Sequence, residues 1–204
     1  MLQELQGWIE ETYQLEPTSP VADFLIDLPM LESQLAEGHP YRHAEEVLLV
    51  SGEDEDFELG LYLHSKFEPE TARLDQASPH QILTTLEGVS HLLLVQHRLK
   101  NAEGLTQLEL ELQAEVDKFL FLRLQPDEAR QEEAKSHLRH AANLEGLSDA
   151  QRETYDAARR LAYRYCLQLE REYLGPHSYD GLFRELRQFY RKNHWKKLQA
   201  LGLP

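Results

Sequence analysis

Three arginines and a tryptophan recur near the carboxyl end of the chain at the spacing of one helix face. Arg184, Arg187 and Arg191 follow one another at intervals of three and four residues, and Trp195 continues the row. At about 100° per residue, the arginines fall within about 60° of one another on a helical wheel. The opposite side is apolar and is formed by Leu182, Phe183, Leu186, Phe189 and Tyr190. We therefore expect one helix over residues 178–198 whose apolar side faces the core and whose basic side faces solvent.

The chemistry that suits this basic row is anion recognition. Guanidinium groups bind carboxylate or phosphate through paired hydrogen bonds, and an indole ring adds a stacking or cation–π surface. Trp and Arg are also favoured anchors of protein–protein interfaces. The predicted binding residues are Arg184, Arg187, Arg191, Lys192, Trp195 and Lys196. Their expected partner is another protein or the chain's own acidic surface, with a nucleic-acid strand and a plain solvated face as alternatives.

The charge distribution disfavours nucleic acid as the main partner. The 204 residues include 21 Lys and Arg against 36 Asp and Glu, a net charge of −15. Residues 135–204 hold 13 basic against 8 acidic residues, which is +5, and residues 1–134 hold 8 against 28, which is −20. Such a field repels nucleic acid from the amino-terminal two thirds, and a dedicated nucleic-acid binder is usually basic overall. An anion is expected to bind, if anywhere, to the carboxyl-terminal third.

A second group of residues suits acid–base chemistry. Glu111 and Glu115 lie four residues apart, and Lys118 follows three residues later. Two carboxylates held close together can raise the pKa of one of them, which suits a general acid or base. The simpler interpretation is that both glutamates face solvent and that Lys118 relieves their repulsion. His91 adjoins an apolar run and is interpreted as a core histidine.

Metal-binding patterns are weak. His137 and His140 are three residues apart with Glu133 one turn earlier, so all three can share a helix face. Di-metal bundles instead carry Glu-x-x-His on two helices and a further Glu on each of the other two. The acidic stretch from Asp54 to Glu58 lacks the glycine and the distal glutamate of a calcium loop. With no phosphate-binding glycine motif and no Cys-x-x-Cys pair either, we expect no metal ion and no cofactor.

The elements that position these residues differ between the two halves of the chain. Apolar residues at helical spacing predict a helix over residues 2–14, and a second short helix begins at Pro29. Residues 46–51 and 57–64 have the patterns of two strands, which with the acidic turn between them predict a β-hairpin.

The segment that follows the hairpin is ambiguous. Ser78 is a typical N-cap for a helix that falters at Gly88. Residues 91–99 can either continue that helix or form a third strand. We favour the strand, because turn-forming residues 101–104 follow it and because a hairpin alone is only marginally stable.

From Thr106 onward the chain is expected to be wholly helical. The predicted helices span about 106–124, 127–145, 148–174 and 178–198, and short connections favour an antiparallel bundle. The fold class is therefore α+β, with a small antiparallel three-stranded sheet and short helices packed on a carboxyl-terminal antiparallel helical bundle. Residues 1–104 form the mixed region and residues 105–204 the bundle region of one compact unit.

The expected function is that of a non-catalytic, cytoplasmic interaction or adaptor protein. Cys166 is the single cysteine, no apolar run approaches the length of a membrane span, and the first residues carry glutamates in place of a signal peptide's positive charge. One rival is an enzyme with a carboxylate or histidine site, with or without a metal ion, where sheet and bundle meet. Its candidate residues are Glu111, Glu115, His91, His137 and His140. A second rival is an accessory nucleic-acid-binding protein.

Overall fold

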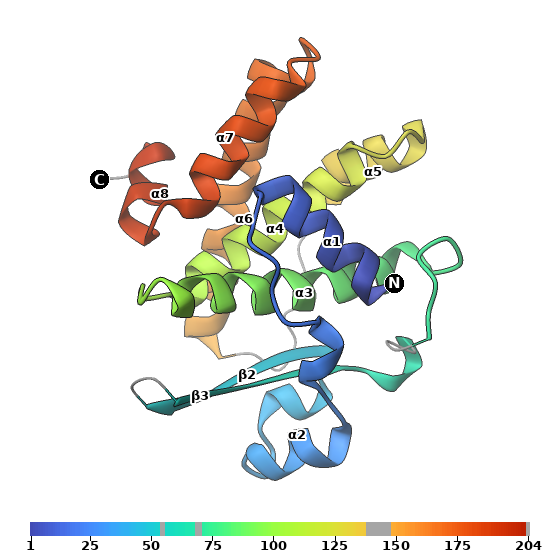
Figure 1. Ribbon diagram of the computed structural model, residues 1–204, viewed down its shortest axis with the longest axis vertical. Helices are drawn as coiled ribbons and strands as arrows, with labels where there is room; N and C mark the ends of the chain where they lie inside the picture. The colour runs from blue at the N-terminus through green and yellow to red at the C-terminus, as the bar shows by residue number, and fades with distance from the viewer. Residues whose placement is uncertain (54–55, 68–70, 138–147, 203–204) are drawn as a thin grey trace.

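Eight α-helices and one three-stranded sheet make up the computed structural model within the described residues, which are 1–53, 56–67, 71–137 and 148–202 (Figure 1). The helices are α1 (Leu2–Tyr13), α2 (Leu28–Gln34), α3 (Pro79–Lys100), α4 (Gln107–Arg123), α5 (Glu128–His137), α6 (Asp149–Leu169), α7 (Tyr179–Arg191) and α8 (His194–Ala200). The strands are β1 (Leu25–Ile26), β2 (Glu46–Glu53) and β3 (Asp56–Leu63). The α+β prediction is confirmed. Among the described helices, none combines the length and the apolar character that crossing a bilayer requires.

The sheet contains the expected hairpin but a different third strand. β2 and β3 are antiparallel, with Leu48 opposite Leu61, and β1 pairs with the other edge of β3 in parallel. The strand order is β1-β3-β2, so the sheet is mixed, and the prediction that residues 91–99 form its third strand is wrong. β1 has only two residues, which is too short to leave a period-two pattern in the sequence.

Residues 91–99 belong instead to α3, a continuous helix of 22 residues. Its N-cap is Ser78, as expected, whose hydroxyl accepts a hydrogen bond from the Gln81 amide at 3.2 Å. Gly88 does not end the helix. A Cβ atom there would lie 2.9 Å from Leu61 Cδ1 and 3.0 Å from Glu46 Cγ. Gly88 is therefore a position at which the helix packs closely against the sheet.

This close approach predicts opposite effects for two helical glycines. Gly88→Ala is expected to lower the free energy of unfolding by about 1–3 kcal/mol, because the new methyl group overlaps Leu61 and Glu46. Gly7→Ala, in the exposed face of α1 with no atom within 4 Å of the new Cβ, is expected to raise it by about 0.5–1 kcal/mol. Urea unfolding followed by circular dichroism measures both. A stabilising Gly88→Ala would contradict the close packing.

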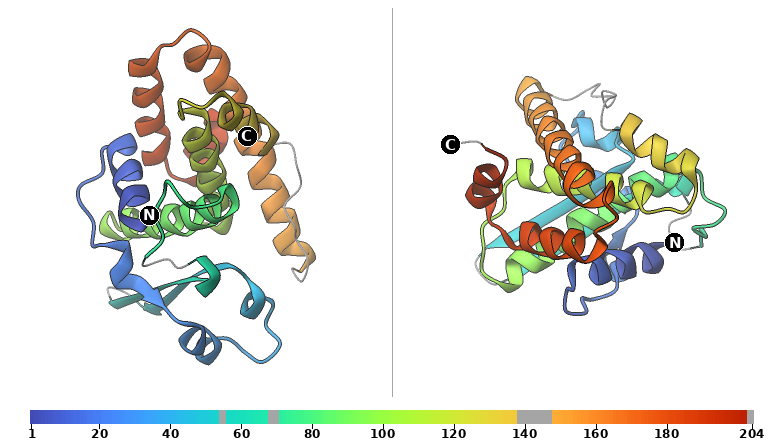
Figure 2. Two further views of the ribbon diagram at one scale, coloured as in Figure 1. Left: turned by 90° about the vertical axis from the view of Figure 1, so that its right-hand side faces the viewer. Right: turned by 90° about the horizontal axis from the view of Figure 1, so that it is seen from above.

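The sheet is covered by helices on both faces (Figures 1 and 2). One face packs on α2, through a small apolar cluster of Leu31, Val47 and Tyr62. The other face belongs to the main core, which includes Leu61 and Leu63 and residues of the helices above them. The alternation of the two sets along each strand is the period of a two-sided sheet. This main core draws on both 1–104 and 105–204.

The central helix of the molecule is α4, which contacts α3, α5 and α6. All but four of its residues are buried, including Glu109, Glu111, Glu115, Asp117 and Lys118. The interpretation of Glu111, Glu115 and Lys118 as a solvent-facing group is therefore wrong. Helices on several sides enclose α4, so its polar side chains must find partners inside the protein.

The carboxyl-terminal helices depart from prediction at one point. α6 and α7 run in opposite directions (Figure 2), and α6 begins with the expected capping box between Ser148 and Gln151. The last helix, however, is broken. α7 ends at Arg191, Lys192 is extended, and Asn193 caps α8 by accepting a hydrogen bond from the Lys196 amide at 3.1 Å. Trp195 and Lys196 therefore lie on α8 and do not continue the arginine row of α7.

Candidate functional site

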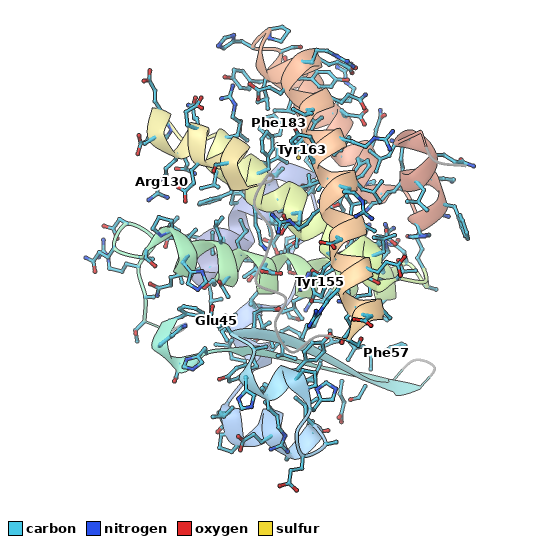
Figure 3. All side chains as sticks on the ribbon, turned by 180° about the vertical axis from the view of Figure 1, so that it is seen from behind. Glu45, Phe57, Arg130, Tyr155, Tyr163 and Phe183 are labelled. Atoms are coloured by element: carbon cyan, nitrogen blue, oxygen red, sulfur yellow. The ribbon has the colours of Figure 1, made fainter. Side chains whose placement is uncertain are left out.

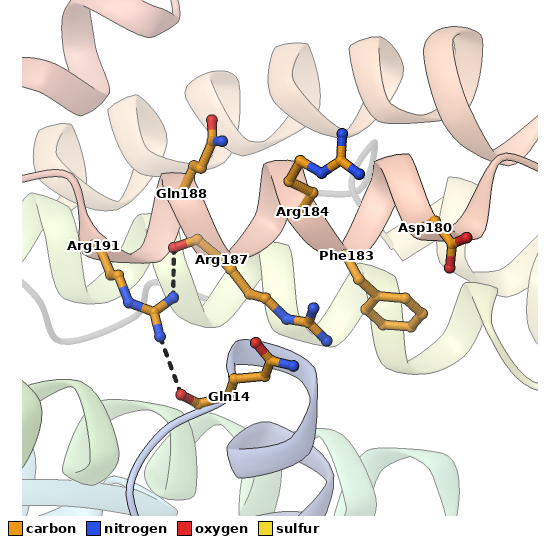
Figure 4. Close-up of a pocket in the computed structure, with 7 residues that line it drawn as sticks. All are labelled: Gln14, Asp180, Phe183, Arg184, Arg187, Gln188 and Arg191. Carbon is orange, nitrogen blue, oxygen red and sulfur yellow. Dashed lines mark hydrogen bonds between the residues drawn. The ribbon is translucent and has the colours of Figure 1, made fainter.

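The three predicted arginines line one groove between α7 and the end of α1 (Figure 4). We call it the arginine groove. Its volume is ≈ 500 Å³, and it is lined by Gln14, Asp180, Phe183, Arg184, Arg187, Gln188 and Arg191. Leu182 and Leu186 are buried behind it, so α7 presents its apolar side to the core and its arginines to the groove. The amphipathic pattern of α7 is what positions the site.

Two of the arginines also hold α1 in place. Arg187 Nε donates to the Thr12 carbonyl at 3.2 Å, and Arg191 donates to the carbonyls of Gln14 and Arg187 at 3.0 Å each (Figure 4). The Thr12 and Gln14 carbonyls lie at the carboxyl end of α1, where the helix dipole favours a cation. Among the described residues, Arg187 and Arg191 therefore bind backbone carbonyls and no acidic side chain.

The remaining predicted binding residues differ in accessibility. Arg184 is exposed and forms no hydrogen bond or ion pair with another described residue, and the terminal nitrogens of Arg187 lack an acceptor among those residues. Trp195 is 67% exposed, and Lys196 is exposed. Lys192 is half-buried, and its carbonyl accepts a hydrogen bond from Arg98 at 2.6 Å. Among the predicted binding residues, the side chains of Arg184 and Trp195 therefore contribute least to holding the fold together.

A second candidate lies where the sheet meets α3, α4 and α6. We call it the junction cluster, and it consists of Glu46, Glu87, His91, Glu111, Glu115, Lys118 and Arg159. The rival prediction placed Glu111, Glu115 and His91 at such a junction, and the structure brings these three into one cluster. Tyr155, on the stretch of α6 nearest the hairpin, adjoins it (Figure 3).

His91 is the centre of the cluster. Its Nδ1 lies 3.5 Å from Glu46 Oε1, and its Nε2 lies 3.8 Å from Glu111 Oε2. The imidazole is 5% exposed and Glu111 is 2% exposed. The His91 Nε2 atom has no hydrogen-bond partner in the described part of the chain. His91 is a core histidine, as expected, but one surrounded by carboxylates.

Basic side chains balance the other carboxylates. Lys118 Nζ lies 2.7 Å from Glu87 Oε2 and 3.1 Å from Glu115 Oε1. Arg159 of α6 lies 3.9 Å from Glu115 Oε2. Lys118 therefore does offset the glutamate charges, as the sequence suggested, but inside the protein.

These neighbours shift the ionisation of the cluster. Burial alone would lower the pKa of His91, but Glu111 and Glu46 outweigh it and raise the pKa to about 9. Burial also raises the pKa of Glu111, opposed by His91 and assisted by Glu87. Burial would lower the pKa of Lys118, yet Glu87 and Glu115 raise it well above its usual value. His91 and Lys118 are thus cationic at neutral pH.

Sequence reasoning missed Glu46 and Glu87. Glu87 lies one turn before His91 on α3, a spacing that would have paired them had 91–99 been assigned to a helix. Glu46 reaches the cluster from β2, which no local spacing reveals. His137 ends α5, and its side chain and His140 lie outside the described residues. The acid–base interpretation of Glu111 and Glu115 stays a prediction.

Comparisons with known proteins add no assignment to either site. No protein-family model matches the chain, and neither the curated proteins nor the solved structures contain a match. The chemistry of the two sites therefore has to be argued from their own geometry.

Proposed function

We propose that this chain is a non-catalytic, cytosolic interaction protein that binds an acidic segment of a partner protein in the arginine groove. The observation that supports this most directly is the groove itself, in which Arg184 and the terminal nitrogens of Arg187 have no acceptor among the described residues. Guanidinium groups in this state are suited to paired hydrogen bonds with a carboxylate.

The lining of the groove favours a peptide over a nucleic-acid strand. Phe183 offers an apolar surface beside Arg187, whose guanidinium carbon lies 5.7 Å from the Phe183 ring centre. Asp180 lines the same groove and opposes a continuous row of phosphates. The chain's net charge of −15 acts in the same direction. A partner peptide in which an acidic residue stands next to an apolar one fits this combination best.

Trp195 supplies a second anchor outside the groove. It is a large apolar side chain at 67% exposure on α8, and its closest ring contact among the described residues is His194, at 5.3 Å between ring centres. Exposed tryptophans are enriched among the residues that dominate interface energies. We include it in the proposed binding surface as a contact independent of the arginines.

Charge reversal at the groove tests the proposal. We expect Arg184→Glu to weaken binding of fluorescein-labelled peptides that carry Glu beside Leu or Phe by about tenfold or more, because a charged hydrogen bond is worth about 1.5–3 kcal/mol. Fluorescence anisotropy measures the affinity, and peptides with Gln in place of Glu give the baseline. Arg184 is chosen because Arg187 and Arg191 also hold α1, so their replacement would disturb the fold.

The matched control is Arg171→Glu, the same change at an arginine that is 78% exposed and lies outside the groove. It is expected to bind the peptides as the wild type does. Trp195→Ser is expected to weaken binding to a smaller degree. Equal affinities of Arg184→Glu and wild type would overturn the proposal, and so would displacement of the peptide by a single-stranded oligonucleotide, which would favour the nucleic-acid alternative.

A further inference from the structure

The His91 ring has the environment of a metal ligand. One of its nitrogens, Nδ1, lies 3.5 Å from Glu46 Oε1, a buried oxygen that has no hydrogen-bond partner among the described residues. The other nitrogen, Nε2, is buried and lies 3.8 Å from Glu111 Oε2 without a hydrogen-bond partner among the described residues. Metal-binding histidines are oriented in this way, with the second ring nitrogen donating to a carboxylate.

The carboxylates on the Nε2 side are close enough to share one ion with it. Ligand atoms of Glu87, His91 and Glu111 all lie within 4.8 Å of one another. Two atoms bound to the same small cation at about 2.0–2.2 Å are separated by about 3–4 Å. Small side-chain rotations therefore suffice to bring the three onto one centre, and the Nε2–Oε2 distance of 3.8 Å already meets this condition.

The charge of the cluster also fits a divalent ion. Its described members contribute four carboxylates against two basic side chains, Lys118 and Arg159. The formal negative charges therefore exceed the positive ones by two. One divalent cation bound by a neutral imidazole would balance them. Buried charge is tolerated when it is compensated in this way.

We propose that Glu87, His91 and Glu111 bind a divalent transition-metal ion, and that Glu46 is a positioning residue, whose carboxylate accepts a hydrogen bond from the Nδ1 N–H of His91. One imidazole with carboxylates suits Zn²⁺, Mn²⁺ or Fe²⁺ better than the all-oxygen preferences of Mg²⁺ and Ca²⁺. The ion links α3 to α4 beside the sheet, at the level where Gly88 allows Glu46 to approach the helix. This site is separate from the arginine groove, and neither proposal depends on the other.

Metal titration of the full chain tests the site. After treatment with a chelator and dialysis, isothermal titration with Zn²⁺ and with Mn²⁺ is expected to show one saturable site per chain, accompanied by a rise in the midpoint of thermal unfolding. His91→Gln and Glu111→Gln are expected to weaken that site at least tenfold. Glu46→Gln is expected to weaken it about tenfold while keeping one ion per chain, as for other residues that orient a metal-bound histidine.

The matched control is His80→Gln. His80 is on the same helix and also contacts a glutamate, Glu45, at 2.6 Å, but its side chain is 67% exposed. Wild-type affinity in His80→Gln together with loss in His91→Gln supports the site.

Two results would overturn it: no saturable one-to-one binding to the wild type, or wild-type affinity in His91→Gln. If His91→Gln and Glu111→Gln do not fold by circular dichroism, Glu87→Gln decides, because the Glu87 side chain is already 23% exposed. Wild-type affinity in that variant would likewise overturn the proposal.

Discussion

Replacing Arg98 by Met is expected to lower the free energy of unfolding by about 3–5 kcal/mol, because it breaks a buried ion pair by removing one partner. Arg98 is 1% exposed at the end of α3 and pairs with Glu103 and with the buried Glu109. It also donates to the carbonyls of Tyr190 and Lys192, at 3.1 and 2.6 Å. Its removal leaves these carbonyls without their charged donor.

The same contacts predict which part of the Arg98→Met variant will unfold locally. The Lys192 carbonyl lies in the break between α7 and α8, and Arg98 holds that break against α3 and α4. On α8, Lys197 adds contacts to Glu109 at 3.3 Å and to Gln113 at 3.2 Å. Arg98→Met is therefore expected to increase cleavage between α7 and α8 in limited proteolysis. Urea unfolding measures the loss of stability.

Lys100→Met is the matched control for Arg98→Met. Lys100 lies two residues further along α3 and pairs with Glu16, but both side chains are largely exposed. Exposed pairs contribute little, so stability and proteolysis are expected to stay close to wild type. Similar losses in both variants would show that Arg98 does not anchor the carboxyl-terminal helices.

Replacing Asp117 by Asn is expected to remove a pH dependence of about 3 kcal/mol from the stability of the protein. Asp117 is fully buried and accepts hydrogen bonds from Tyr13, from Ser90 at 2.5 Å and from Gln113 at 3.0 Å. Burial raises its pKa from 3.8 to about 6, and the hydrogen bonds from Ser90 and Tyr13 oppose this only in part.

The direction of this pH dependence of stability follows from the raised pKa of Asp117. The folded protein holds the Asp117 proton more tightly than the unfolded chain does, so this stabilisation is complete below about pH 4 and is lost as the pH rises through 6. The difference corresponds to about 3 kcal/mol, at 1.36 kcal/mol for each pKa unit. An Asn side chain has no proton to lose, and its amide can keep an acceptor for Tyr13 and a donor for Ser90.

Urea unfolding of both proteins between pH 4 and pH 7 checks this. The stability of Asp117→Asn relative to wild type is expected to increase by about 2–3 kcal/mol over this range. Asp156→Asn, the same change at an exposed residue of α6, provides the comparison. A constant difference between Asp117→Asn and wild type would mean that Asp117 titrates as an ordinary surface carboxylate.

Local sequence patterns correctly predicted the helices and strands that have one apolar side and one polar side. The helix over 2–14, the hairpin, the capping box at Ser148 and the amphipathic face of α7 are each present in the structure. In each of them, the contrast between apolar and polar positions repeats with the period of the element. The arginine groove could be anticipated in the same way, since Arg184, Arg187 and Arg191 share a face by spacing alone.

The same patterns gave wrong predictions for helices that other parts of the protein enclose on several sides. α4 carries carboxylates on a buried surface, and its sequence resembles a solvent-facing helix because periodicity records only contrast along the chain. The strand predicted over residues 91–99 is wrong for a related reason, since a short apolar run has no period of its own. The break at Asn193 depends on Arg98, which is distant in sequence.

The α+β class, most of the helices and the basic face of α7 could be predicted from the sequence, because these follow from contacts between near neighbours in the chain. Which polar groups are buried together depends on the packing of distant segments. Glu46 comes to His91 from a strand, Glu111 comes from another helix, and Gly88 permits the approach. The pKa of His91 and the proposed metal site arise from this arrangement, since electrostatic interactions depend on distance in space and not on spacing in the sequence.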